Sequence, residues 1–278
     1  MSKKGPIVAQ TQDGLQNQAP REGFIEADGF RIRYMEAGQG TPLVHLHGAG
    51  GMRLTPGYDL LCRHHRVVAF EMPGFGSSPE NTRTRTMAEL AATLAMAVRD
   101  LGIDKFNLMG TSFGAKVALW LAVQRPERVE ALVLEAPAAI RPAGSEPSSG
   151  SPEEMARRLY AHPERLAPLP VPDLAIQAKT RALVARLRGP DRDADLETQM
   201  RHLQTPTLVL FGTLDRVIPP EMGRFYKELL PNCHLVFVYD AGHAISTERP
   251  EAFAEVTVDF LERREAFVVS RTETVIHP

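Results

Sequence analysis

Short apolar runs alternate with segments of helical spacing along most of this chain, and this alternation constrains its fold more than any other feature. The runs PLVHLHG (42–48), KFNLMG (105–110) and PTLVLFG (206–212) each end in glycine. After Thr86, apolar residues instead recur at the three- and four-residue intervals of a helix. Continuous apolar strands separated by helices are typical of a parallel sheet that is covered on both faces. We therefore predict an α/β fold with a mostly parallel central sheet and helices on both faces.

The same alternation predicts the domain boundaries. We expect one core built from residues 23–137 and 206–264, because the strand and helix patterns stop between them. Residues 138–205 begin with a Pro/Gly/Ser-rich stretch and then become helical and rich in arginine, which predicts a helical insertion above the core. Residues 1–22 are expected to be a polar, mobile leader, and residues 265–278 a C-terminal tail.

Composition excludes several classes of protein. Lys plus Arg number 32 and Asp plus Glu number 34, so net charge favours neither nucleic acid nor an anionic membrane as a partner. No apolar run approaches the roughly 18 residues of a spanning helix, so no membrane partner is expected. The two cysteines, Cys62 and Cys233, form no metal or redox motif, and no histidine pair has convincing metal spacing. A reduced, cytoplasmic setting is expected.

One serine stands where a strand-like run meets a helix-like run. Ser112 lies in GTSFG (110–114), with a glycine two places away on each side. A sharp strand–turn–helix junction needs such small neighbours, because the backbone at the serine is strained and packs closely against both elements. The turn exposes the hydroxyl beside the N-terminus of the following helix, whose free N–H groups can stabilise an oxyanion. Ser112 is therefore a candidate nucleophile.

A serine hydroxyl needs a base, and the base needs an acid that orients it. Asp215 follows one predicted strand and His243 follows the last, in the chain order Ser, Asp, His that this type of junction uses. Residues at the carboxyl ends of parallel strands gather at one edge of the sheet, so the three can converge. Glu135, which ends the strand before the insertion, is a rival for the role of the acid.

Together, these residues resemble the α/β-hydrolase fold family over about residues 23 to 264. The matching segments are HGAGG (47–51), EMPGFGSS (71–78), GTSFG (110–114), GTLDRVIPP (212–220) and AGH (241–243). The resemblance implies an α/β-hydrolase fold in which the insertion at 138–205 is a helical cap.

The resemblance also implies the roles of single residues. Ser112 corresponds to the nucleophile, Asp215 to the acid and His243 to the base. The backbone N–H groups of Ala49 and Phe113 correspond to the oxyanion hole, and Gly50 is a weaker alternative to Ala49. The family members in question work without a cofactor or metal, so none is expected here.

Within that family the chain is most similar to capped hydrolases related to meta-cleavage carbon–carbon hydrolases and simple carboxylesterases. Glu71 replaces the usual Asp of the EMPGFG loop, which we interpret as structural. Ala244 follows His243, where the carbon–carbon hydrolases usually have Trp, and this favours ester cleavage.

Three functions follow for this chain. The main expectation is hydrolysis of a small carboxylic ester, or a similar acyl compound, through an acyl-enzyme on Ser112. The alternative is carbon–carbon hydrolysis or acyl transfer by the same three residues. A non-catalytic ligand-binding protein with this fold is the third. The partner is thus a small molecule with an ester-like group, and the sequence makes no prediction of the oligomeric state.

Overall fold

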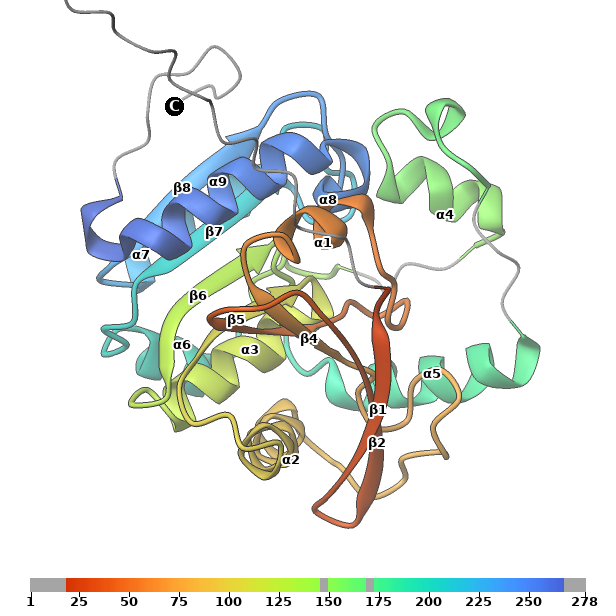
Figure 1. Ribbon diagram of the computed structural model, residues 1–278. Helices are drawn as coiled ribbons and strands as arrows, with labels where there is room; N and C mark the ends of the chain where they lie inside the picture. The colour runs from red at the N-terminus through yellow and green to blue at the C-terminus, as the bar shows by residue number, and fades with distance from the viewer. Residues whose placement is uncertain (1–18, 146–149, 169–172, 268–278) are drawn as a thin grey trace, which may run out of the picture.

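A single mixed sheet forms the centre of the computed structural model, in which residues 19–145, 150–168 and 173–267 are described (Figure 1). Its strand order is β1-β2-β4-β3-β5-β6-β7-β8. Only the pairs β1–β2 and β2–β4 are antiparallel among those ladders, so the sheet is mostly parallel as predicted. The strands are β1 Arg21–Ala27, β2 Phe30–Ala37, β3 Pro42–Leu46, β4 Arg66–Phe70, β5 Phe106–Thr111, β6 Val129–Glu135, β7 Thr207–Gly212 and β8 Cys233–Val238.

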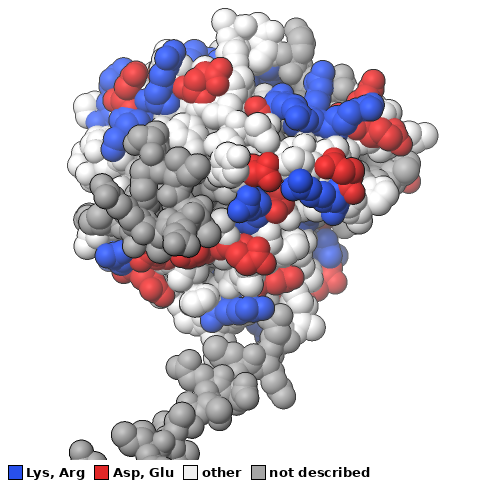
Figure 2. All heavy atoms as spheres, turned by 90° about the horizontal axis from the view of Figure 1, so that it is seen from above, with Lys and Arg blue, Asp and Glu red and all other residues white. Residues whose placement is uncertain are grey.

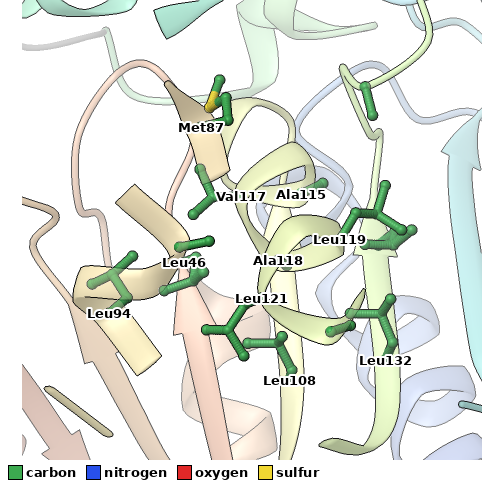
Figure 3. Packing of buried hydrophobic residues seen from close by; sticks show 14 of the residues in the cluster. Leu46, Met87, Leu94, Leu108, Ala115, Val117, Ala118, Leu119, Leu121 and Leu132 are labelled. Carbon is green, nitrogen blue, oxygen red and sulfur yellow. The ribbon is translucent and has the colours of Figure 1, made fainter. Parts of the chain in front are cut away.

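Helices cover both faces of this sheet, which confirms the predicted fold class. Helices α2 (Met87–Asp100), α3 (Phe113–Gln124) and α7 (Gly223–Leu229) share one apolar core with the sheet. Helices α1 (Pro56–Leu61) and α9 (Pro250–Arg263) share the other. Figure 3 shows how α3 is enclosed: its side chains lie between α2 and the strand residues Leu46, Leu108 and Leu132. Buried apolar surface on both sides of the sheet holds its edge, and therefore the loops at that edge, in place.

Local sequence signals account for several of these elements. Asp28 and Gly29 both have positive φ, 48° and 70°, which gives the two-residue turn between β1 and β2 that the Asp-Gly pair predicts. Thr86 Oγ1 accepts the N–H of Glu89 and begins α2, as the spacing of a capping box predicts. The returning Glu89 carboxylate accepts the N–H of Arg85 rather than that of Thr86.

The regular elements in the described part of the segment 138–205 are all helical. It contains α4 (Pro152–Leu159), the 3₁₀ turn η1 (Pro163–Arg165), α5 (Leu174–Leu187) and α6 (Ala194–Met200). Leu183 and Leu187 of α5 are buried against the core, whereas Leu174 at the start of α5 is 80% exposed. Residues 146–149 and 169–172 lie outside the described residues.

The remaining described elements lie near the C-terminus. They are η2 (Pro220–Met222), α8 (Ile245–Glu248) and η3 (Arg264–Ala266). Phe267 follows η3 and is buried, with its ring against those of His234 and Phe260. Residues 1–18 of the expected leader and 268–278 of the expected tail lie outside the described residues.

The described surface carries both signs of charge. On the face shown in Figure 2, Lys and Arg side chains are intermingled with Asp and Glu side chains rather than gathered in one patch. Across the described residues, no helix is both long and apolar enough to cross a membrane.

Candidate active site

The backbone at Ser112 has the strained geometry that its flanking glycines predict. Ser112 lies between the end of β5 at Thr111 and the start of α3 at Phe113, with φ 52° and ψ −110°. A non-glycine residue in this region is uncommon and is retained where the surrounding structure enforces it. The serine is only partly buried, and it lies where β5 ends at the edge of the sheet.

Close packing explains why glycine flanks the serine on each side. A Cβ on Gly114 would lie 2.2 Å from the carbonyl oxygen of Leu46, and one on Gly110 would lie 2.6 Å from Cα of Ala115. Those distances are far below van der Waals contact, and the atoms met are backbone atoms that cannot move aside. The GTSFG pattern is therefore a consequence of how tightly strand, turn and helix pack here.

Asp215 and His243 are joined directly by a hydrogen bond. His243 Nδ1–H donates to Asp215 Oδ2 at 2.8 Å, and both side chains are almost completely buried, at 6% and 0% exposed. The other oxygen, Oδ1, accepts the N–H groups of Val217 at 2.7 Å and Ile218 at 2.9 Å. These bonds hold the carboxylate in one orientation, so that Nδ1 of the imidazole carries the proton and Nε2 is left as the acceptor.

Glu135, the rival acid, has other partners. Its Oε1 accepts the N–H of Ser246 at 2.8 Å, and its Oε2 accepts the hydroxyl of Thr111 at 2.7 Å. Its backbone carbonyl accepts the N–H of Ser112 at 2.9 Å. Glu135 thus connects the turn that carries Ser112 with the segment that follows His243. Burial raises the pKa of its carboxyl, against the opposing effect of these donors.

A buried histidine extends this network toward β3. His45 Nε2–H donates to Thr111 Oγ1 at 3.2 Å, and burial lowers the pKa of His45 to about 3. A neutral His45 fits its role as a donor to a hydroxyl that itself donates to Glu135. No local pattern in the sequence relates β3 to Thr111, so this contact is not predictable from the sequence.

The loop that contains Ala49 runs beside the serine. A Cβ on Gly48 would lie 3.6 Å from Cβ of Ser112, and a turn between Gly48 and Gly51 follows. The ring of His47 anchors the loop: Nδ1–H donates to the Gly48 carbonyl at 2.7 Å, and Nε2 accepts the N–H of Met72 at 3.1 Å. Burial lowers the pKa of His47 to about 4, which keeps this ring neutral and able to accept.

The second predicted donor is the N–H of Phe113. As the first residue of α3, Phe113 has an N–H with no acceptor one turn earlier in its own helix. Its ring is buried against Phe75, with the ring centroids 5.7 Å apart, so the start of α3 is held firmly. Ala49 and Phe113 therefore flank Ser112 on two different segments.

The geometry brings the predicted residues to one edge of the sheet. Asp215 and His243 are paired, and Glu135 links the backbone of Ser112 to the segment after His243. No hydrogen bond joins Ser112 Oγ to His243 in this part of the described chain, and such bonds often form only when substrate binds. An accessible serine, a buried acid–base pair and free N–H groups are the elements of acyl transfer.

Comparisons with known proteins identify the family of the chain. A model described as the Alpha/beta hydrolase family matches residues 43–256. The chain is 32% identical to a 2-hydroxymuconate semialdehyde hydrolase of Pseudomonas putida, over 90% of this chain and 97% of the relative. It is 28% identical to a 2-hydroxy-6-oxo-6-(2'-aminophenyl)hexa-2,4-dienoic acid hydrolase of Metapseudomonas resinovorans, over 87% of this chain and 91% of the relative.

A solved structure gives a similar result. The fold matches that of a thermophilic esterase from Thermogutta terrifontis with a TM-score of 0.72 and 25% identity, over 88% of this chain and 99% of the esterase. The family match covers most of the described core, and the relatives are matched over nearly their whole lengths. The chain therefore belongs to the alpha/beta hydrolase family of enzymes.

Proposed function

We propose that this protein is a serine hydrolase in which Ser112 is the nucleophile, His243 the base and Asp215 the acid. The observation that carries the proposal is the buried Asp215–His243 pair at the sheet edge that also holds the strained Ser112. His243 takes the proton of Ser112, and Asp215 stabilises the resulting imidazolium. The N–H groups of Ala49 and Phe113 stabilise the oxyanion, each donor contributing about 10²–10³-fold in rate. This scheme requires no cofactor.

For the substrate, we propose a 2-hydroxy-6-oxo-hexa-2,4-dienoate. The two relatives above are named as hydrolases of such compounds. Compounds with these names contain no ester, so their hydrolysis breaks a carbon–carbon bond. After tautomerisation places a proton on C5, attack on the C6 carbonyl can release C5, because the electrons of the broken bond delocalise through C3=C4 into the C2 carbonyl. This reading replaces ester cleavage, the main expectation from the sequence, as the better supported of the two.

Ester hydrolysis is the second candidate. Ala244 follows His243, where the carbon–carbon hydrolases usually have Trp, and the structural neighbour from Thermogutta terrifontis is an esterase. Both reactions require a serine nucleophile, an oxyanion hole and a general acid. The two reactions differ in the leaving group. In carbon–carbon cleavage the leaving carbon needs a delocalised electron pair, whereas in ester cleavage the leaving alkoxide needs only a proton.

A direct comparison of substrates tests the assignment. We expect kcat/KM for 2-hydroxymuconate semialdehyde to exceed that for p-nitrophenyl acetate and butyrate by at least about 100-fold, which corresponds to about 2.7 kcal/mol of transition-state stabilisation. Loss of 2-hydroxymuconate semialdehyde is followed by the absorbance of its dienolate form, and ester cleavage by the absorbance of the released p-nitrophenol. Ser112→Ala provides the background rate for each substrate. A preference of the same size for the esters would instead establish the second candidate.

We also propose that the helical segment 138–205 acts as a cap that selects substrates by size. The segment begins after the carboxyl end of β6, at the catalytic edge of the sheet, and the carbonyl of Leu159 at the end of α4 accepts the N–H of His243. Met155 of α4 and Ile176 of α5 are half-buried, unlike the fully buried Leu183 and Leu187 that attach α5 to the core. Apolar side chains of this kind can line an acyl site and exclude water from it.

Truncation of the half-buried residues tests the cap. Met155→Ala and Ile176→Ala are expected to shift the chain-length preference, measured as kcat/KM across dienoates whose C6 substituent increases in size. Labelling of Ser112 by a small fluorophosphonate should stay unchanged, because that probe does not reach the cap. Leu174→Ala, on the same helix but exposed, is the matched control. Parallel profiles for all three variants and the wild type would limit the segment to a structural role.

A further inference from the structure

The loop that carries His243 is bonded to the end of α4, far from it in sequence. The N–H groups of His243 and Ala244 both donate to the carbonyl of Leu159, at 2.8 and 3.2 Å. Leu159 is the last residue of α4, which lies next to α8 in Figure 1. The backbone of the candidate base is therefore tied to the first helix of the segment 138–205.

A single carboxylate joins the same two segments a second time. Glu248, at the end of α8, accepts the N–H of Gly242 on Oε2 at 2.7 Å. Its Oε1 accepts the N–H of Ala161 at 2.8 Å and that of His162 at 3.2 Å. Hydrogen bonds from N–H groups to an ionised acceptor are stronger than neutral ones, and here three converge on one side chain that is only partly exposed.

The fit between the two segments is close. A Cβ on Gly242 would lie 2.7 Å from the nitrogen of Ala161 and 2.8 Å from the carbonyl oxygen of Leu159. Glycine at this position lets the two backbones approach until the Glu248 carboxylate can bridge them. No larger residue could occupy position 242 without separating α4 from the loop of His243.

Two further contacts hold the same end of α4. Arg216, the residue after Asp215, donates to the carbonyl of Arg157 at 3.0 Å. His162 Nε2–H donates to Asp240 Oδ1 at 2.6 Å, three residues before His243. The loops of the candidate acid and of the candidate base thus both contact residues 157–162.

We propose that Glu248 is a positioning residue that makes the end of α4 and the backbone of residues 242–244 one mechanical unit. The proposal deepens the proposed function, since it rests on His243 as the base. It follows that the first part of the cap moves only together with His243. Any displacement of residues 159–162, for example by a substrate that does not fit, moves the imidazole relative to Ser112 and slows the reaction.

Amide hydrogen exchange, read residue by residue by NMR, tests the coupling without reference to activity. Glu248→Gln keeps the shape of the side chain but turns one acceptor into a donor that faces N–H groups. The amide oxygen should stay with the two N–H groups of Ala161 and His162, so we expect faster exchange at Gly242, which loses its acceptor directly. The decisive amides are His243 and Ala244, whose acceptor is Leu159 and not Glu248. If the end of α4 and residues 242–244 open together, the amides of His243 and Ala244 should both exchange at least about 10-fold faster.

Kinetics provide the second readout. Glu248→Gln should lower kcat about 10- to 100-fold with little change in KM, because a small displacement of the base costs rate rather than binding. The second-order rate of Ser112 labelling by a small fluorophosphonate should fall by a similar factor. Glu251→Gln, an exposed carboxylate in the first turn of α9, is the matched control and should match the wild type in all three measurements.

The outcomes are distinct. Unchanged exchange at His243 and Ala244 in a folded Glu248→Gln variant would overturn the proposal, and so would unchanged kcat. If that variant does not fold, Gly242→Ala probes the same interface from the other side, and unchanged exchange at Ala244 in this variant would overturn the proposal equally. Failure of the proposed function is a different result: the wild type itself would not be labelled at Ser112.

Discussion

Ser112→Ala is expected to lower kcat by about 10⁵–10⁶-fold on any substrate that the wild type hydrolyses, since loss of the nucleophile removes the covalent route entirely. Alanine fits the turn, because it is smaller than serine and the glycines at 110 and 114 remain. The variant should therefore unfold at the wild-type temperature. The measurements are steady-state turnover, intact-mass detection of the fluorophosphonate adduct, and thermal unfolding followed by circular dichroism.

The matched control is Ser77→Ala, at an exposed serine in the loop after β4. It should retain full turnover and full labelling. Labelling of Ser112→Ala at the wild-type rate would show that another residue reacts with the probe, and the assignment of the nucleophile would then be wrong. Loss of activity together with loss of the folded state would instead make Ser112 a structural residue of the turn between β5 and α3.

Asp215→Asn is expected to lower kcat by about 10⁴-fold. The N–H groups of Val217 and Ile218 require an oxygen, so the asparagine carbonyl should stay with them and its NH₂ should face His243. Nδ1 of the imidazole must then accept, which places the proton on Nε2. In that tautomer His243 cannot take the proton of Ser112.

Glu135→Gln, the comparison variant, should lower kcat far less, by about 10-fold. Its partners are Thr111 and Ser246, and neither is predicted to exchange a proton with substrate. Both variants are assayed for kcat on the preferred substrate, with the folded state verified by circular dichroism. The reverse ranking would make Glu135 the acid and would reduce Asp215 to a residue that orders the turn before η2.

The pairing of Asp215 with His243 illustrates which contacts sequence can predict. Both residues follow strands, and parallel strands place their carboxyl ends at one edge, so convergence follows from strand order alone. Glu135 satisfies the same rule, and the sequence left it as a rival acid. The choice between them depends on side-chain direction at the end of β6, where Glu135 meets Thr111 and Ser246.

The bounds of some helices also follow from neighbouring residues in the sequence. Helix α3 begins directly after Ser112, as the strand–turn–helix pattern predicts, and most of its apolar residues are buried. The helix α8 was not predicted. It has only four residues, too few to show a helical period, and it is stabilised by packing against α9.

By itself, the sequence determined the elements that short-range chemistry controls. The spacing of apolar residues specified an α/β sheet, and the glycines around Ser112 specified a sharp turn between strand and helix. Only the tertiary structure decided which carboxylate pairs with His243, how His45 reaches Thr111, and that Glu248 joins α4 to the loop of His243. Those contacts connect residues 28, 66 and 87 positions apart. Over such separations, side-chain direction and the packing of whole elements decide which groups meet, and neither leaves a periodic signal in the chain.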